Sequence, residues 1–220
     1  MSELASEFAD LRPELEQGLV TLGERAQAHQ ADALLMYLTM LSNWSRAYNL
    51  TAIREPRAML VQHVLDCVSV LRFVRGPRVL DIGSGAGLPG FVIAILRPDL
   101  HVTLVDSVAK KTTFCRQVCA HLRIGNVEPM HTRIEKLDVG TGFDTIVARA
   151  FASLGKLNAC ATRALAPGGT IVAMKGKQSD AELDELRAGR VLVDVKTVFV
   201  PQLDAHRHIV LMQPPEQVSA

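Results

Sequence analysis

The clearest chemical signal in the sequence is the segment 80–90, LDIGSGAGLPG, in which an apolar run is followed by glycines at every second position. Gly83, Gly85 and Gly87 lack Cβ atoms, so the chain can turn tightly there and a ligand can come close to the backbone. The GxGxG spacing differs from the GxGxxG of dinucleotide sites, and Asp81 lies just before it. A carboxylate there would repel a pyrophosphate but suits a cation. The segment therefore predicts a loop that binds a positively charged ligand.

A second carboxylate, Asp106, ends the next apolar run, 102–105. From that position a carboxylate can accept hydrogen bonds from both hydroxyls of a ribose. Taken alone, Asp106 could merely cap the following helix. Together with the glycine loop it predicts a site for S-adenosylmethionine, which carries a ribose, an ammonium and a sulfonium group. A Rossmann-like domain that binds another nucleotide, or none, is the alternative.

Two later segments are expected at the same edge of the sheet. Ile134 and Glu135 follow an expected strand at 126–130 and could lie beside an adenine. Glu135 could equally be a solvated acid at a helix start. Residues 165–169, LAPGG, are expected to form the turn into a fifth strand.

The fourth expected strand, 145–148, leads to Arg149 and Phe151. Enzymes that methylate exocyclic amines usually have an Asn/Asp-Pro-Pro-aromatic segment here, and this chain does not. A methyl acceptor such as guanine N7 has a lone pair and no proton, so its methylation needs alignment more than a general base and does not require that segment. Arg149 could contact the guanine or the cofactor, and Phe151 could stack on a base or simply pack in the core. Arg149 is therefore the predicted catalytic residue.

Basic residues occur where loops should reach this edge, and they predict contact with RNA phosphates, although surface Lys and Arg are solvated by default. They are Arg54, Arg57, Lys110, Lys111, Arg133, Lys175 and Lys177. Acids gather on a later expected helix. They are Asp180, Glu182, Asp184 and Glu185.

Histidines give no metal-ligand pattern. His63 and Asp66, three residues apart on an expected helix, could face the cleft or pair with each other. His206 and His208 lack a third ligand, so no metal is predicted.

Two helices should precede the glycine loop. Residues 31–48 carry an apolar stripe at helical spacing, and Pro56 suits the first position of a second helix. The stripe consists of Leu34, Leu38, Leu41, Trp44 and Tyr48, and the second helix should bury Leu60, Val64, Cys67 and Leu71. Residues 1–55 are interpreted as a helical extension and residues 56–220 as the catalytic domain.

Strands and helices then alternate, with helices expected at 90–96 and 109–122. Further strands are expected at 170–174, 191–200 and 208–212, the last two as an antiparallel hairpin. This pattern predicts an α/β fold, a doubly wound sheet of seven strands.

Bulk properties narrow the function classes. The chain has 220 residues, 48% hydrophobic and 21% charged, with a net charge of +1. A uniformly basic nucleic-acid-binding surface is excluded, so any RNA contact must be a local patch. The four cysteines show no zinc spacing and are expected to be reduced. Without a signal peptide or an apolar run of about 20 residues, the protein is expected in the cytoplasm and not in a membrane.

Several segments resemble the RsmG (GidB) family of bacterial 16S rRNA guanine-N7 methyltransferases, from about residue 35 onward. They are WSRAYNLTAIR at 44–54, HVLD at 63–66, the loop at 81–90, RAFASL at 149–154 and MKG at 174–176. The first thirty residues do not share the likeness.

The resemblance implies a class I methyltransferase fold. It also implies transfer of a methyl group from S-adenosylmethionine to N7 of guanine 527 in 16S rRNA, with S-adenosylhomocysteine as product. The family's cofactor contacts correspond to Gly83, Leu88, Ile134, Glu135 and Arg149. The expected partner is 16S rRNA within the small subunit or its precursor, bound by a monomer. A methyltransferase of another substrate, or a non-catalytic S-adenosylmethionine-binding assembly factor, remains the alternative.

Overall fold

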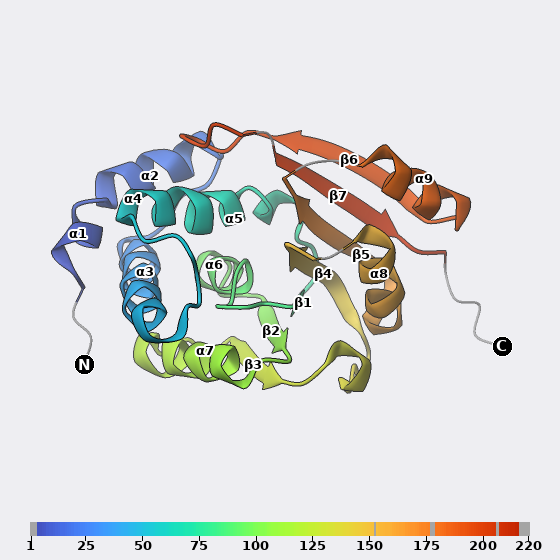
Figure 1. Cartoon of the computed structure of the whole chain (residues 1–220), viewed down its shortest axis with the longest axis horizontal. Coiled ribbons are helices and arrows are strands. Elements are labelled where there is room, and N and C mark those ends of the chain that lie inside the picture. The colour runs from blue at the N-terminus through green and yellow to red at the C-terminus, as the bar shows by residue number, and fades with distance from the viewer. Residues whose placement is uncertain (1–3, 152, 177–178, 206, 216–220) are drawn as a thin grey trace.

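A seven-stranded sheet forms the centre of the computed structural model, which describes residues 4–151, 153–176, 179–205 and 207–215. Its strand order is β3-β2-β1-β4-β5-β7-β6, and all neighbours are parallel except those that involve β7 (Figure 1). The strands are β1 Arg78–Ile82, β2 His101–Asp106, β3 Val127–His131, β4 Phe143–Arg149, β5 Leu165–Lys175, β6 Leu192–Val198 and β7 Arg207–Gln213.

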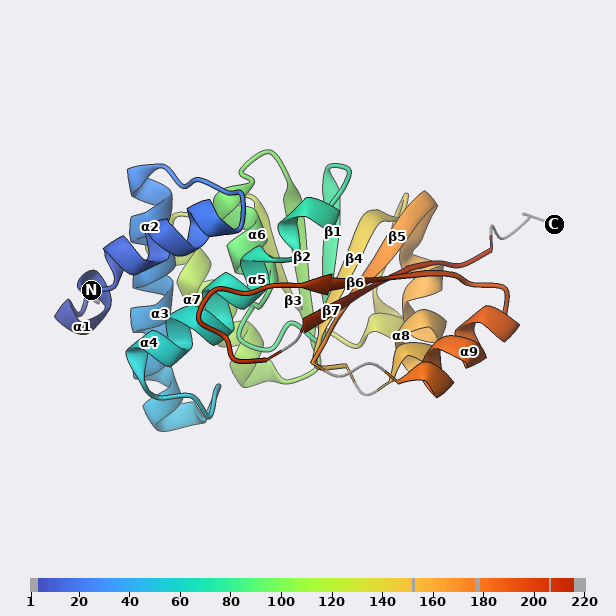
Figure 2. The same ribbon diagram turned by 90° about the horizontal axis from the view of Figure 1, so that it is seen from above.

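Helices cover both faces of the sheet. The α-helices are α1 Ser6–Ala9, α2 Arg12–Thr21, α3 Ala28–Tyr48, α4 Pro56–Met59, α5 Asp66–Val68, α6 Gly90–Leu96, α7 Ala109–Leu122, α8 Leu154–Ala161 and α9 Asp180–Ala188. Shorter helices are η1 Leu60–Leu65, a π-helix, and the 3₁₀ turns η2 Leu71–Phe73, η3 Ile134–Lys136 and η4 Thr162–Ala164. Figure 2 shows α8 and α9 on one side of the sheet and α3, α6 and α7 on the other.

Neighbouring residues of each central strand point to opposite faces, and both faces are buried. Val79 packs in the core that includes α6 and α7, whereas Leu80 packs in the core that includes α8 and α9. A strand buried on both faces is apolar at successive positions, which explains the short apolar runs in the sequence. The predicted doubly wound α/β fold is confirmed.

The long helix α3 begins three residues earlier than the apolar stripe indicated. Gln27 and Gln30 cap each other's backbone N–H groups, a glutamine version of the capping box. The helix ends at Asn49, whose φ of 51° is left-handed. Tyr48 belongs to the stripe but is 46% exposed, and its ring lies 5.2 Å from that of Trp44.

The second helix starts at Pro56, as predicted, and the Glu55 carboxylate accepts from the N–H groups of Arg57 and Ala58. It widens into the π-helix η1 and returns to α-geometry at α5. The four apolar residues expected on its inner side are all buried. The helical N-terminal segment packs on the same apolar core as the sheet.

The fifth strand is longer than expected. Residues 165–169 were expected to be a turn, but they belong to β5. Phe143 pairs with Leu165 and Thr145 with Thr170, so the register shifts by a bulge between them. Gly168, with a φ of +74°, provides the local bend. The β6–β7 hairpin is antiparallel, as predicted, with β7 next to β5.

The described residues contain neither a helix that could span a membrane nor a disulfide. None of their helices is long and apolar enough to cross a membrane. All four cysteines lie among them, and none is in a disulfide.

Candidate active site

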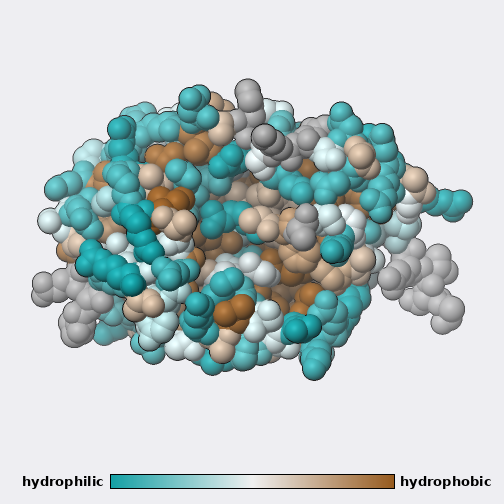
Figure 3. All heavy atoms as spheres, in the orientation of Figure 1, coloured by the Kyte–Doolittle hydropathy of each residue, from teal (hydrophilic) through white to brown (hydrophobic). Residues whose placement is uncertain are grey.

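A cleft lies at the carboxyl ends of the parallel strands, and it consists of two adjoining cavities. The first cavity, about 530 Å³, extends from the glycine loop to η1 and Arg207. The second cavity, about 450 Å³, lies between Asp106, η3 and Phe151. Residues common to both walls are Gly83, Lys111, Arg149 and Ala150. Figure 3 shows this face hollowed near its middle, with apolar residues recessed below a hydrophilic rim.

The glycine loop forms one wall of the first cavity. Gly83 and Gly85 have φ values of +67° and +60°, a backbone conformation that glycine adopts without strain. A Cβ on Gly85 would meet no atom closer than 3.9 Å, so the wall stays open above it. The N–H groups of Gly83 and Ser84 donate to the Val105 carbonyl at 2.8 and 3.1 Å, which fixes the loop across the end of β2.

Gly87 was predicted to contact the cofactor, but it lines neither cavity of the cleft. Its φ is +88°, and a Cβ there would lie 2.2 Å from the Phe91 ring. Gly87 therefore allows close packing of the loop on α6. Leu88, by contrast, lines the first cavity.

Asp81 lies behind the loop and not on a cavity wall. It is 0% exposed, and its Oδ2 accepts from the Gly90 N–H at 2.8 Å. Burial raises the pKa of Asp81 to about 7, while the bond from Gly90 and the charge of Arg149 lower it. Direct contact between Asp81 and a ligand, which the sequence analysis expected, is not favoured by this position.

Asp106 connects the glycine loop to the second cavity. Its Oδ2 accepts from Gly85 N–H at 2.9 Å and its Oδ1 from Val108 N–H at 2.8 Å, and Lys111 Nζ lies 3.5 Å away. The carboxylate is 7% exposed and lines the second cavity. Val108 is the N-cap residue of α7, so Asp106 is not the helix cap considered as an alternative. Oδ1 keeps a further lone pair for a ligand, and the second lone pair of Oδ2 accepts only the long bond of 3.5 Å from Lys111.

The far wall of the second cavity holds Ile134, Glu135 and Phe151, as expected. Ile134 is buried, and Arg163 donates to its carbonyl at 2.8 Å, which holds the turn in place. Glu135 is exposed in the first turn of η3 and also lines the cavity, so both of its interpretations remain compatible with its position. Phe151 is half-buried.

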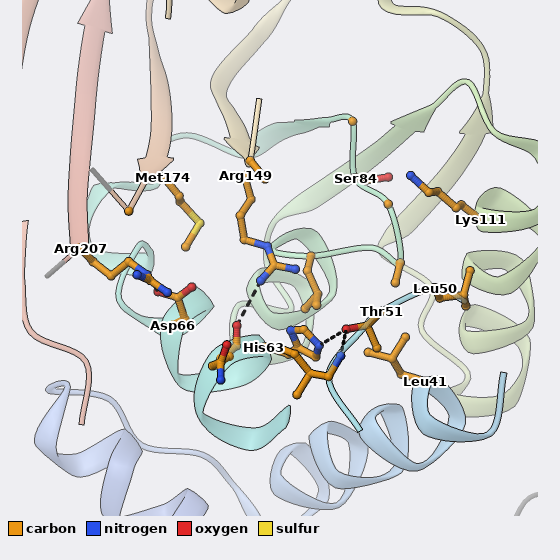
Figure 4. A pocket seen from close by; sticks show the side chains of 18 of the residues that line it. Leu41, Leu50, Thr51, His63, Asp66, Ser84, Lys111, Arg149, Met174 and Arg207 are labelled. Carbon is orange, nitrogen blue, oxygen red and sulfur yellow. Dashed lines mark hydrogen bonds and ion pairs between the residues drawn. The ribbon is translucent and has the colours of Figure 1, made fainter. Parts of the chain in front are cut away.

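Arg149 lies between the two cavities at the end of β4. Its Nη1 donates to the carbonyl of Gln62 in the π-helix at 3.1 Å (Figure 4). Ala150 follows with a φ of 56°, an uncommon conformation for a residue with a Cβ. This turn of the chain brings both Arg149 and Phe151 to the cleft, since both line it.

His63 and Asp66 both face the first cavity and do not pair with each other. The Nε2 atom of His63 lies 2.9 Å from Thr51 Oγ1, and Asp66 Oδ1 accepts from Arg207 Nε at 3.0 Å. Burial, followed by the charge of Arg149, lowers the pKa of His63 to about 4. Sequence reasoning missed Arg207, which comes from the start of β7 and has no local motif.

The basic residues expected on the rim differ in their positions relative to the cleft. Lys111 and Lys175 line the cleft, although Lys175 pairs with Glu182 at 3.2 Å, so an acid of α9 also reaches this rim. Arg54 donates to Asn49 Oδ1 and Lys110 to the Tyr48 carbonyl; both are exposed and line neither cavity, although their sequence neighbours Ile53 and Lys111 line the first one.

Arg57 was also expected on this rim, but it lines neither cavity. Its guanidinium donates to Glu14 at 2.7 Å and to Gln202 at 3.0 Å. Arg133 lines the second cavity. Lys177 and His206 lie outside the described residues. Among the described ones, no cluster of His, Cys, Asp and Glu could hold a metal ion.

Comparison with known proteins identifies close relatives. The family model described as rRNA small subunit methyltransferase G matches residues 30–210. A protein of Leptothrix cholodnii named ribosomal RNA small subunit methyltransferase G is 50% identical, with 92% of this chain and 95% of the relative covered. The protein of that name from Methylococcus capsulatus is 42% identical, with 93% and 100% covered.

Solved structures show the same fold at low sequence identity. A SAM-dependent methyltransferase from Aquifex aeolicus matches with a TM-score of 0.56 at 17% identity, covering 74% of this chain and 96% of that one. A tRNA (uracil-54, C5)-methyltransferase from Pyrococcus abyssi, in complex with S-adenosylhomocysteine, matches with a TM-score of 0.54 at 20% identity, covering 69% and 38%.

Proposed function

This chain belongs to the rRNA small subunit methyltransferase G family, and from this we infer that it methylates N7 of guanine 527 in 16S rRNA with S-adenosylmethionine as methyl donor. The single observation that carries the proposal is the family match over residues 30–210, which includes both walls of the cleft up to Arg207.

The cleft fits S-adenosylmethionine on two observations. The positive φ values of Gly83 and Gly85 leave backbone without side chains on one wall. Asp106, fixed by two backbone N–H groups, offers its remaining lone pairs in the second cavity. We propose that Asp106 accepts the ribose hydroxyls and that Ile134 and Glu135 lie beside the adenine. The glycine loop and Leu88 would then hold the methionine part.

When bound, S-adenosylmethionine supplies a methyl group on a positively charged sulfur. The acceptor nitrogen needs no base, because N7 of guanine has a lone pair and loses no proton. The residues of the chain therefore act by alignment and by exclusion of water. Arg149, between the cavities, has further N–H donors besides the one given to Gln62, and it would align the acceptor with the cofactor.

The same cleft offers contacts for the RNA around the target guanine. Lys111 and Lys175 line it, and the exposed Arg54 and Lys110 adjoin the lining residues Ile53 and Lys111 in the sequence. We propose that these four cations contact phosphates and that Phe151 contacts a base. The partner is then the small ribosomal subunit or its precursor, in the cytoplasm.

Methyl transfer to ribosomal RNA tests the proposal. Small subunits whose guanine 527 is unmethylated are incubated with the purified protein and labelled S-adenosylmethionine, and the RNA is then cleaved at 7-methylguanine with borohydride and aniline. We expect label in 16S rRNA and cleavage at that guanine. Subunits that already carry the methyl group serve as the control and should take up no label. Cofactor binding without methyl transfer would favour a non-catalytic assembly factor instead.

A further inference from the structure

The first cavity has two sides that differ in chemistry. Figure 4 shows Ser84 and Lys111 on one side, Asp66, Met174 and Arg207 on the other, and Arg149 between them. Under the function proposed above, the cofactor occupies the side formed by the glycine loop. The opposite side is then left for the acceptor base.

Asp66 is the one carboxylate among the described residues that line this first cavity. It is 5% exposed, and its Oδ1 accepts from Arg207 Nε at 3.0 Å. Its Oδ2 has no hydrogen-bond partner among the described residues. This oxygen is not completely enclosed by protein atoms, so a ligand in the cavity can reach it. A nearly buried carboxylate oxygen with no hydrogen-bond donor is costly, so this oxygen favours a ligand that brings donors to it.

Two guanidinium groups act on the Asp66 carboxyl, and Arg207 donates a hydrogen bond to it. Burial raises the pKa of its carboxyl, and the nearby Arg207 and Arg149 oppose that rise. An ionised carboxylate accepts hydrogen bonds and donates none. Arg207 also fixes the orientation of the group, because its Nε donates to Oδ1 of a carboxylate that lines the cavity.

Guanine and adenine differ at the edge that such a carboxylate would meet. With N7 toward the cofactor, the N1 and N2 positions of guanine lie on the far side of the base. Guanine has donors at both positions, N1–H and N2–H, whereas adenine has an acceptor lone pair at N1 and no group at C2 that donates. A carboxylate therefore attracts guanine and repels adenine at this edge.

We propose that Asp66 selects guanine as the methyl acceptor by accepting hydrogen bonds from N1–H and N2–H of the base. This inference rests on the proposed function and assigns the base-reading role to the first residue of α5, which lines the same cavity as the glycine loop. Met174 supplies an apolar surface for the ring, and Arg149 supplies donors for O6.

The same contact favours the reaction as well as binding. Methylation at N7 leaves a positive charge on the purine, and that charge makes N1–H a stronger donor. A fixed carboxylate at this edge therefore interacts more strongly with the product-like transition state than with neutral guanine. We expect changes at Asp66 to lower kcat as well as raise KM.

The proposal is tested by changing one group on each partner: the N2 amino group of the target base and the carboxylate of Asp66. Small subunits are reconstituted with 16S rRNA carrying either guanosine or inosine at the target position, since inosine lacks only the N2 amino group. The wild type should methylate guanosine roughly 10- to 100-fold faster, the value of one hydrogen bond to a charged acceptor. For Asp66→Asn we expect that preference to fall to about 3-fold or less, because guanosine loses the contacts of both N1–H and N2–H with the carboxylate, whereas inosine loses only that of N1–H.

Two controls separate recognition from general damage. Asp194→Asn removes one exposed carboxylate on β6 and should keep the wild-type preference. Cofactor affinity of Asp66→Asn, measured by calorimetry, should stay within about 2-fold, because Asp66 lies on the acceptor side. An equal loss on guanosine and inosine would show that Asp66 only supports the fold and would reject the proposal.

If Asp66→Asn does not fold, the wild-type rates on guanosine and inosine still test the proposal. Equal wild-type rates on guanosine and inosine reject the role of Asp66 while the proposed function stands. No methyl transfer to guanosine by the wild type rejects the proposed function and the inference with it.

Discussion

Replacing Asp81 with asparagine removes a titratable group and keeps the shape of the side chain. The Asp81 carboxyl is fully buried, its Oδ2 accepts from Gly90 N–H, and its Oδ1 has no partner among the described residues. The asparagine oxygen can accept the same bond, and the amide carries no charge at any pH. The variant therefore isolates the cost of ionising a carboxyl behind the glycine loop.

The size of the effect follows from the pKa. Burial raises the pKa of Asp81 from 3.8 to about 7 in the folded protein, so the folded state holds this proton more tightly than the unfolded chain does. The stabilisation is fully present below pH ~4 and is lost as the pH rises through about 7. A difference of about 3 units at about 1.4 kcal/mol each gives about 4 kcal/mol.

Urea unfolding at pH 4 and pH 8, followed by the fluorescence of Trp44, the single tryptophan, measures this difference. Between the two pH values, the free energy of unfolding of Asp81→Asn should shift relative to the wild type by about 4 kcal/mol in favour of the variant. Asp194→Asn, an exposed change on β6, should run parallel to the wild type. Parallel curves for Asp81→Asn and the wild type would refute the buried, proton-binding state of Asp81.

Three other substitutions test separate parts of the site. Asp106→Ala should weaken binding of S-adenosylmethionine by about 2 to 4 kcal/mol in calorimetry, since two charge-assisted bonds to the ribose are lost, and an unchanged affinity would remove that role. Arg149→Lys should slow methyl transfer, because a point charge does not replace a planar fork, and an undiminished rate would exclude Arg149 from the reaction. Gly87→Ala should lower the free energy of unfolding by more than about 1 kcal/mol, because its φ is +88° and its Cβ would meet Phe91, whereas Gly125→Ala has open space and should cost less. Equal losses in chemical denaturation would contradict the packing role of Gly87.

Features encoded within one strand–helix–strand unit were predictable from the sequence. The helices at 90–96 and 109–122 have the bounds that their apolar spacing indicated. The glycine loop and Asp106 meet at one edge because parallel strands bring their carboxyl ends together. Periodicity and turn residues therefore sufficed for these elements, although they missed the local Gln27–Gln30 cap and the strand character of residues 165–169.

Features that depend on distant partners were not predictable. Arg57 was expected on the RNA rim, but its partner Glu14 comes from α2, and nothing near Arg57 in the sequence indicates that pairing. Arg207 reaches Asp66 because β7 inserts beside β5, an arrangement that no single segment encodes. The start of α3 was missed because glutamines, weak helix caps by residue type, cap it reciprocally.

A crystal structure of the protein with S-adenosylhomocysteine tests the central claim that one cleft holds the cofactor and the acceptor side by side. We expect the ribose hydroxyls within hydrogen-bonding distance of Asp106, the adenine beside Ile134, and the side of the first cavity around Asp66 left free. Density for the ligand outside the cleft, or across the Asp66 side, would contradict the account.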